Sequence, residues 1–237
     1  MEDISNVYVT PLPDSPYVKP FRLVYTQNGK EKTWDLLQVH DSVSIILFNI
    51  TRRVMIFVKQ FRPAIYYNLL SLEDRQKRTI DTSKYSAADA CALEMCAGIV
   101  DKANSTLELI AKEEVMEECG YDIDINTLQR VMSYRAGVGV QGAIQTLFYC
   151  EVTDAMKINQ GGGVDDEIIE VVEKTIPEIE TMLESNGVIN SPTSCLFALM
   201  WFLRNKANKY RKSYETTCSE CRQFLPHNPY YWERGEN

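Results

Sequence analysis

The first 60 residues show an alternation of hydrophobic and polar positions that predicts β-strands. Four stretches carry this pattern: 21–27, 32–39, 41–48 and 54–60. The dipeptide Asn28-Gly29 lies between the first two, and Asn-Gly is a preferred sequence of the type I′ hairpin turn. We therefore expect the chain to begin with antiparallel sheet.

The pattern changes to a helical period in the stretch that ends at Gly120. Ser105 and Glu108 form an S-x-x-E capping box, and Gly120 is a natural C-cap, so a helix of about four turns is predicted between them. At about 100° per residue, Glu114 and Glu118 fall inside the apolar stripe that should face the core. An ordinary solvated acidic face would place its glutamates on the opposite side of the helix.

Carboxylates at this spacing repel one another, and burial of an uncompensated charge is costly. A cation is therefore expected beside Glu114, Glu117 and Glu118. Hard divalent ions, above all Mg²⁺, are bound by carboxylate oxygens and keep water and phosphate oxygens as further ligands. The alternative is an ordinary surface helix whose glutamates pair with lysines.

The second half of the chain combines strands, glycine-rich loops and one apolar helix. Strands are predicted over 93–96, 128–135, 143–152 and 168–172. Gly137, Gly139 and Gly142 match G-x-G-x-x-G, but a strand follows them where a nucleotide-binding turn needs a helix, so we expect a hairpin loop. Residues 191–205 are predicted to form a helix that is buried on all sides.

The length of the chain suits one domain with additions. Residues 41–207 are expected to form the main domain, between an N-terminal sheet region at 1–40 and a polar tail at 208–237. Within the main domain, residues 66–90 are polar and lack a clear period, which predicts a long surface insertion.

Composition argues against several classes of function. The 237 residues carry a formal net charge of −8, which is unfavourable for binding to nucleic acid or to an anionic membrane. The sequence has neither a leader pattern nor an apolar run of about 18 residues, so we expect a cytoplasmic protein. Most of the seven cysteines lie in apolar runs and should be buried free thiols. Cys218 and Cys221 form a lone CxxC in the tail, where a metal site would need a second pair of ligands.

The helical stretch with its glutamates resembles the Nudix box, G-x5-E-x7-R-E-U-x-E-E-x-G-U. Its second half reads E-E-V-M-E-E-C-G-Y from Glu113 to Tyr121, and A-G-I-V-D precedes it at 97–101. The match departs from the pattern where Gly98 stands one residue further from the glutamates, and where Glu113 occupies the position of the box arginine. The resemblance to the Nudix hydrolase family extends over roughly residues 16–204.

This resemblance implies a set of metal-binding residues. Glu114 and Glu118, with the backbone carbonyl of Ala97, would hold Mg²⁺, for which Mn²⁺ can substitute, and Glu117 would complete or position that shell. The ions would neutralise charge on a diphosphate and supply a hydroxide-like nucleophile at neutral pH.

Further site residues follow from the same resemblance. Glu167 aligns with the family's general base, and Asp166 is the alternative. The string V-K-Q-F-R-P-A at 58–64 resembles the Q-x-R-P strand of the branch that acts on nucleoside diphosphate sugars, which implies that Arg62 binds the phosphates of the substrate. The simpler alternative is an arginine that ends a strand beside a proline. Glu94 is expected to add a metal ligand or a substrate contact.

The T-W-D string at 33–35 resembles an element of the N-terminal sheet in that branch. It implies that Trp34 contacts the nucleobase in a homodimer that exchanges N-terminal sheets, whereas an isolated strand tryptophan would otherwise be assigned to the core. The implied fold is α+β, a Nudix-type α/β/α sandwich with a mixed sheet, preceded by an N-terminal antiparallel sheet.

The activity that the resemblance implies is Mg²⁺-dependent hydrolysis of nucleoside diphosphate sugars, with UDP-glucose giving UMP and glucose 1-phosphate. Two alternatives remain at this stage. One is hydrolysis of ADP-ribose or other ADP-sugars. The other is a Nudix-fold protein that senses nucleotide sugars without turnover.

Overall fold

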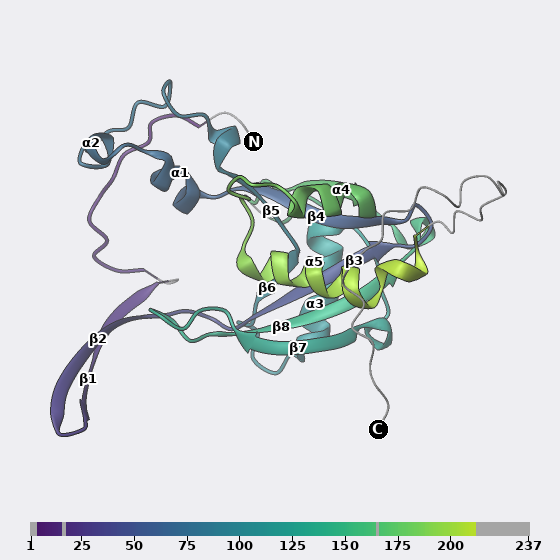
Figure 1. Cartoon of the computed structure of the whole chain (residues 1–237), viewed down its shortest axis with the longest axis horizontal. Helices are drawn as coiled ribbons and strands as arrows, with labels where there is room; N and C mark the ends of the chain where they lie inside the picture. Colours follow the sequence, from purple (N-terminus) through teal and green to yellow (C-terminus); the bar gives the residue numbers. More distant parts are fainter. Residues whose placement is uncertain (1–3, 16–17, 165, 212–237) are drawn as a thin grey trace, which may run out of the picture.

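The computed structural model describes residues 4–15, 18–164 and 166–211. Most of it is a mixed seven-stranded sheet that helices cover on both faces (Figure 1). Its strands are β3 (Ser42–Asn49), β4 (Val54–Phe61), β5 (Cys91–Glu94), β6 (Cys96–Ile99), β7 (Gln129–Arg135), β8 (Ile144–Val152) and β9 (Glu170–Thr175). Five strands run in the order β5-β4-β3-β8-β7, while β6 pairs with β3 and β9 pairs with β4.

The middle of the sheet is the parallel pair of β3 and β8. Every residue of β3 after Ser42 is buried, as expected for a strand that is covered on both faces. Alternate side chains enter two separate cores, with Ile45 and Leu47 on one face and Ile46 and Phe48 on the other. The continuous apolar run of this strand therefore places it at the centre of the sandwich.

Three helices complete the sandwich. α3 (Leu107–Cys119) packs on one face of the sheet, and α4 (Ile176–Leu183) and α5 (Thr193–Asn205) cover the other (Figure 1). Short 3-10 turns lie at Ile125–Thr127, Asp154–Met156 and Ala207–Lys209. The predicted α/β/α sandwich with a mixed sheet is confirmed. The sequence analysis did not predict α4, because its eight residues follow the β-rich run of β9 without an intervening turn.

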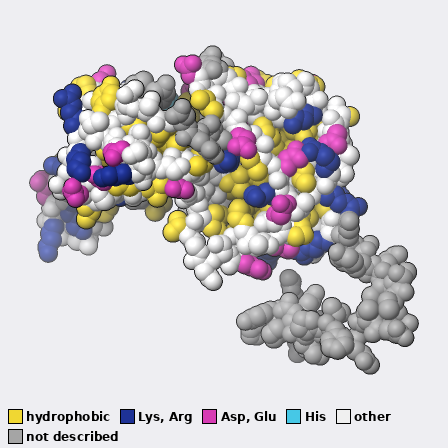
Figure 2. Space-filling model, turned by 90° about the horizontal axis from the view of Figure 1, so that it is seen from above, with side chains coloured by type: hydrophobic (Ala, Val, Ile, Leu, Met, Phe, Trp, Pro, Cys, Tyr) yellow, Lys and Arg dark blue, Asp and Glu magenta, His cyan; other side chains and the backbone are white. Residues whose placement is uncertain are grey.

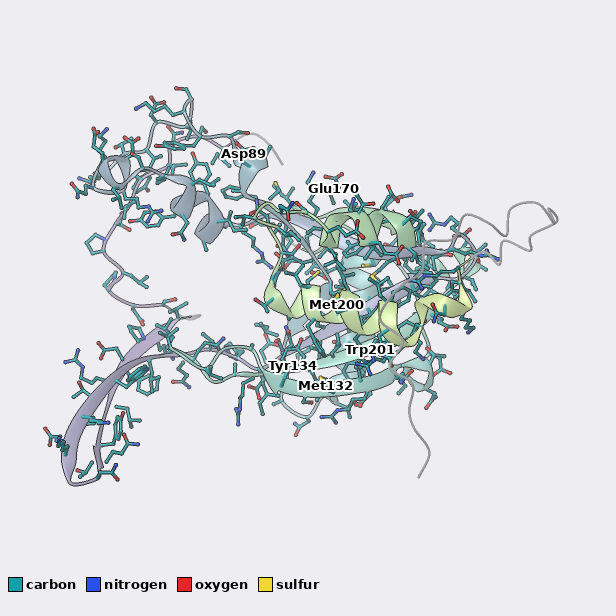
Figure 3. All side chains as sticks on the ribbon, in the orientation of Figure 1. Asp89, Met132, Tyr134, Glu170, Met200 and Trp201 are labelled. Carbon is teal, nitrogen blue, oxygen red and sulfur yellow. The ribbon has the colours of Figure 1, made fainter. Side chains whose placement is uncertain are left out.

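The prediction that the helix at 191–205 is buried on all sides is wrong. The buried residues of α5 are Cys195, Ala198, Leu199 and Phe202, which recur at the spacing of a single helix face. Met200, on the outer side, is 59% exposed (Figure 3). The helix buries only the face that packs on the sheet, because no element of the described chain covers its outer side.

A two-stranded ribbon stands apart from the sandwich. β1 (Lys19–Gln27) and β2 (Lys30–Gln38) pair antiparallel around a turn in which Asn28 and Gly29 have φ of 54° and 73°, which confirms the predicted hairpin. Figure 1 shows the ribbon in purple, projecting from the body of the molecule. Most of its side chains are exposed, so the ribbon adds little to the core of its own chain.

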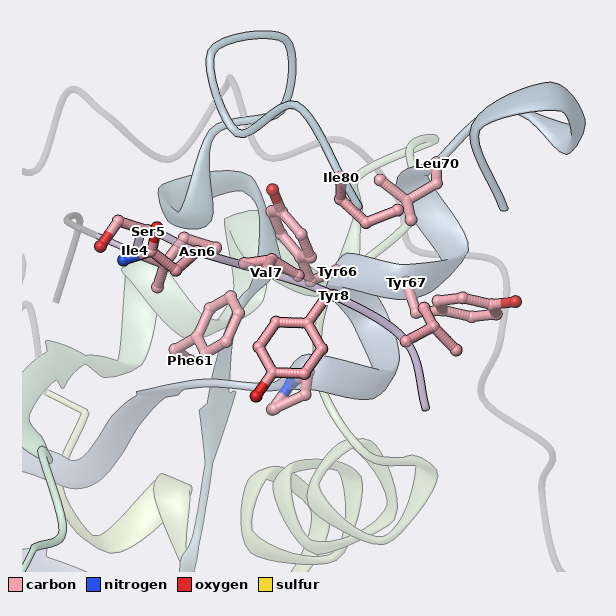
Figure 4. A pocket seen from close by; sticks show the side chains of 12 residues that line it. Ile4, Ser5, Asn6, Val7, Tyr8, Phe61, Tyr66, Tyr67, Leu70 and Ile80 are labelled. Carbon is pink, nitrogen blue, oxygen red and sulfur yellow. The ribbon is translucent and has the colours of Figure 1, made fainter. Parts of the chain in front are cut away.

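The segment predicted as a surface insertion at 66–90 has a small core of its own. Its elements are α1 (Pro63–Leu69), α2 (Leu72–Arg75) and a 3-10 turn at Ala87–Ala90. Tyr66, Leu70, Ile80 and Ala90 are buried together. The N-terminal segment lies across them, where Ile80 N donates to Val7 O at 2.9 Å, and a cavity of about 510 Å³ lies between the two segments (Figure 4). The insertion is therefore an ordered unit attached to the end of β4.

The loop that contains Gly137, Gly139 and Gly142 joins β7 to β8, which pair antiparallel. The predicted hairpin loop is thus confirmed, and the dinucleotide-binding interpretation stays excluded because no helix follows the glycines.

The surface and the cysteines agree with a protein of mixed charge and free thiols. Figure 2 shows Lys and Arg side chains mixed with Asp and Glu on one face of the molecule. The free cysteines of the described chain are Cys91, Cys96, Cys119, Cys150 and Cys195, of which all but Cys91 are buried. Cys218 and Cys221 lie outside the described residues. None of the helices in the described part of the chain has the length and apolar character needed to cross a bilayer.

Candidate active site

The helix α3 carries the three glutamates of the box. Its N-cap is Thr106, whose hydroxyl accepts a hydrogen bond from Leu109 N at 3.2 Å. The predicted capping box at Ser105 is therefore wrong by one residue, because Thr106 is the extended residue that precedes the first helical one. The helix ends at Gly120 in the left-handed conformation, as predicted.

A glycine loop closes the C-terminal end of α3. Gly162 N donates to Glu118 O at 2.9 Å, and Gly163 N donates to Glu117 O at 3.1 Å. The three glycines of this loop have φ between 70° and 114°, a region that other residues rarely adopt. The glycine run therefore joins the loop of the predicted general base to the helix of the predicted metal ligands.

Glu118 is the most deeply buried of these acids. It is 5% exposed, and its Oε2 accepts a hydrogen bond from Ala97 N at 3.0 Å. Burial raises the pKa of its carboxyl to about 8; repulsion from Glu114 and Glu167 adds to the rise, while the bond from Ala97 opposes it. A cation beside this carboxyl would favour its ionised form at neutral pH.

Glu114 lies against the backbone of β6. A Cβ on Gly98 would stand 1.9 Å from Glu114 Oε1, so this close approach requires glycine. Burial raises the pKa of Glu114 to about 7, and repulsion from Glu117 and Glu167 adds to the rise. The acids lie on the core side of the helix, as the helical period predicts.

Arg62 and Glu94 form a bidentate ion pair beside these acids. Arg62 Nε is 2.5 Å from Glu94 Oε1, and Arg62 Nη2 is 2.7 Å from Glu94 Oε2. The side chain of Glu94 is 9% exposed and that of Arg62 is 44% exposed, so the guanidinium keeps one side open to solvent. The bond to Glu94 is the main cause of the raised pKa of Arg62, and attraction to Glu118 and Glu167 adds to it. The structure thus shows Glu94 as the partner of Arg62.

The loop after the glycines brings Glu167 toward α3. Its carboxylate accepts a hydrogen bond from Val164 N at 3.1 Å and lies 2.7 Å from the position of a Cβ on Gly163. Its charge raises the pKa values of Glu114 and Glu118, although Glu167 and Asp166 are both exposed to solvent. Of the two predicted bases, Glu167 is the one that the fold brings to the acids.

Trp34 lies on the ribbon and is docked on the β7–β8 loop. Its Nε1 donates to Gly139 O at 2.6 Å, and Leu37 N donates to Val140 O at 2.7 Å. The residue is 52% exposed, so the assignment to a core is wrong. Contact with a nucleobase stays a prediction for this side chain.

No family model matches the chain. The uridine diphosphate glucose pyrophosphatases NUDT14 of Bos taurus and Mus musculus are each 38% identical to it over 213 residues, 85% of this chain and 95% of theirs. The chain belongs to the Nudix hydrolase family. Its place within the family is the nucleoside diphosphate sugar pyrophosphatase branch, and it is an enzyme. The GDP-mannose pyrophosphatase of Salmonella arizonae is 27% identical over 156 residues, 66% of this chain and 71% of that protein.

The acids of this Nudix enzyme fit a divalent cation for which the protein would provide only part of the coordination shell. Within the described residues, no three acidic, histidine or cysteine side chains converge into a complete ion site. Mg²⁺ in phosphate chemistry commonly uses one or two carboxylates and completes its shell with water and substrate oxygens. Glu114 and Glu118 could supply this partial set, because burial and repulsion between the acids raise both pKa values, and a cation beside them would offset that cost.

The structure adds two residues that the sequence analysis missed. The buried thiol of Cys96 lowers the pKa of the Glu118 carboxyl, although a cysteine in an apolar strand is usually an ordinary core residue. Lys102 pairs with Glu113 at 2.6 Å. The sequence signal for Lys102 is Glu113, because an acid at the position of the box arginine indicates that a cation comes from another part of the chain.

Proposed function

We propose that this Nudix enzyme is a Mg²⁺-dependent UDP-glucose pyrophosphatase that produces UMP and glucose 1-phosphate. The observation that carries the proposal is the position of Glu114 and Glu118, two carboxyls with raised pKa values on the core side of α3, beside Arg62. The 38% identity with two enzymes named for UDP-glucose supports the choice of substrate.

Glu114 and Glu118 would hold the ions in this proposal, and the carbonyl of Ala97 and Glu117 would complete the shell that the protein provides. When bound, divalent ions neutralise charge on a diphosphate and lower the pKa of a bound water. The hydrogen bond from Ala97 N holds Oε2 of Glu118 and so orients the carboxylate toward the proposed ions.

Arg62 would bind the diphosphate, and Glu94 would orient the guanidinium of Arg62. Glu94 occupies Nε and Nη2 of the guanidinium, which leaves Nη1 to donate to a phosphate oxygen. Because the carboxylate of Glu94 is buried, the guanidinium has one preferred orientation before the substrate arrives.

Glu167 would accept the proton of the attacking water, with Asp166 as the alternative. The bond from Val164 N holds one oxygen of Glu167, and the glycine loop fixes its distance from α3. A carboxylate that is exposed, as Glu167 is, can pass the proton on to solvent after each turnover.

A substrate panel tests the function directly. UDP-glucose, GDP-mannose and ADP-ribose are assayed with Mg²⁺ or with EDTA, and products are separated by chromatography. UDP-glucose is expected to give UMP and glucose 1-phosphate with kcat/KM at least about tenfold above the other two, and no turnover in EDTA. A preference for ADP-ribose would contradict the proposed substrate, and ligand-induced thermal stabilisation without any product would favour the sensor alternative.

We propose that the enzyme is a cytoplasmic homodimer joined through the ribbon. Large apolar side chains of the ribbon are exposed: the exposed fraction is 49% for Phe21, 57% for Val24 and 52% for Trp34. A two-stranded ribbon that nothing covers is marginally stable in water. The free thiols of the described chain support the cytoplasmic location, because the cytosol keeps cysteines reduced. Light scattering is expected to give about twice the chain mass of 27.2 kDa. A monomer in that measurement, or recovery of the protein from a secretory compartment, would contradict this part of the proposal.

A further inference from the structure

Lys102 lies in the loop that connects β6 to α3. Its Nζ is 2.6 Å from Oε2 of Glu113, which lies one residue before Glu114 on the helix. The bond to Glu113 is the main cause of the raised pKa of Lys102, and attraction to Glu117 and Glu114 adds to it. Lys102 is therefore a cation that interacts with three acids of α3.

The pair adds a contact between α3 and the loop beyond β6, next to the place where β6 itself packs on the helix. β6 carries Ala97 and Gly98, which contact Glu118 and Glu114, and the loop follows β6 directly. Val100 N donates to Asp41 O at 2.8 Å, so the start of the loop is fixed to the body of the protein. Within the described chain, no other ion pair connects this loop to α3.

The pair has its acid at a helix position where the Nudix box has a base. The box pattern has an arginine where this chain has Glu113, and here the positive charge comes from the loop. Lys102 also offsets part of the repulsion that Glu117 and Glu167 exert on Glu114. The acid at position 113 thus has a cationic partner in the loop, and that cation also acts on Glu114.

We propose that Lys102 is a positioning residue that acts through Glu113 and fixes the loop after Ala97 and Gly98 against the acids of α3. The inference rests on the proposed function, whose metal-binding acids it positions. The side chains of Lys102 and Glu113 are 51% and 34% exposed, and exposed ion pairs contribute little to global stability. The effect that we expect is local, on the position of the loop, and it should appear in kcat and in amide exchange without a change in global stability.

The first test measures kcat and KM with UDP-glucose and Mg²⁺. We expect kcat to fall about fivefold in Lys102→Ala and about 20-fold in Lys102→Glu, where two like charges face each other, with KM unchanged within about twofold. The charge-reversed double variant K102E/E113K, which restores the pair, is expected to return kcat to within about threefold of wild type. Lys102→Arg should behave as wild type.

The second test needs neither substrate nor metal. Hydrogen–deuterium exchange of the backbone amides at 101–106 is measured in the metal-free protein. Exchange is expected to be faster in Lys102→Ala and Lys102→Glu, and to return to the wild-type rate in K102E/E113K. The matched control is Lys112→Ala, because Lys112 lies on α3 next to Glu113 but pairs with Asp122 at 3.0 Å. Its kcat and its exchange in the loop should not change.

Three results would overturn the inference: a double variant as slow as Lys102→Glu, a rise in KM in place of the fall in kcat, or equal effects in the Lys112 control. A rise in KM would make Lys102 a substrate contact. If the wild-type enzyme does not hydrolyse UDP-glucose, the exchange measurement alone decides the role of the pair, so failure of the proposed function is recognised separately.

Discussion

Glu118→Gln is expected to lower kcat for UDP-glucose by about 1,000-fold, because the amide cannot bind a divalent ion as the carboxylate does. The substitution keeps the shape of the side chain, and the amide oxygen can still accept the hydrogen bond that Ala97 N now donates to Glu118. The loss should therefore appear in kcat without unfolding. Glu108→Gln is the matched control, since Glu108 lies in the first turn of the same helix and should retain wild-type kcat.

The same substitution should stabilise the metal-free protein at alkaline pH. Burial raises the pKa of Glu118 to about 8, so the folded state holds a proton that the unfolded state has released above its ordinary value of 4.5. Stability from this group is present below pH 4.5 and is lost as the pH rises through about 8. Glutamine removes that loss, which predicts a gain of about 4 kcal/mol at pH 8 and less than about 1 kcal/mol near pH 5.

Urea unfolding in EDTA at the two pH values measures this difference, and Mg²⁺ should then stabilise wild type more than Glu118→Gln. A variant that keeps its activity would remove Glu118 from the metal site. Equal stability of the two proteins at pH 8 would show that the carboxyl is not held in a costly environment.

Arg62→Ala is expected to raise KM at least about tenfold and to destabilise the metal-free protein. The KM effect follows from loss of the donor to the phosphates. The stability effect follows because the carboxylate of Glu94, 9% exposed, loses the partner that faces it. Removal of one member of a buried pair costs about 3–5 kcal/mol, but Arg62 is 44% exposed, and solvent screening reduces the expected cost to about 1–2 kcal/mol.

A double variant separates the two effects. In R62A/E94Q the uncompensated carboxylate is gone, so stability should recover toward wild type while KM stays high. Arg130→Ala provides a control. Arg130 is an exposed arginine of β7, and the hydrogen bond that its side chain makes within the described residues goes to Ser133. Unchanged KM in Arg62→Ala would show that another cation binds the diphosphate.

The sequence predicts the acids of α3 well because one physical rule decides their placement. A helix advances by a fixed angle per residue, so the apolar positions around Glu114 and Glu118 determine which way the acids face. The same rule failed for α5, where every residue from Cys195 to Leu203 is apolar and the period has no contrast. Only the tertiary packing shows that Met200 is left uncovered.

The insertion and the ion pairs could not be predicted from periodicity. α2 has four residues and α1 has seven, which is too short for a helical period to show above the polar background. Arg62 and Glu94 are 32 residues apart, and Lys102 and Glu113 are 11 apart, so each pair is created by the fold and not by local sequence. The family resemblance implies that Arg62 binds phosphates, whereas its pairing with Glu94 is known only from the structure.

The glycine loop that closes the end of α3 attaches the proposed base to the proposed metal ligands. Gly162 N and Gly163 N donate to carbonyls of α3, so the loop of Glu167 is held on the helix of Glu114 and Glu118. Arg62, the proposed phosphate contact, is held differently, because its carbonyl accepts the first hydrogen bonds of α1 at the start of the insertion. We therefore expect exchange of the insertion among related enzymes to alter the surroundings of Arg62 more than those of the acids on α3.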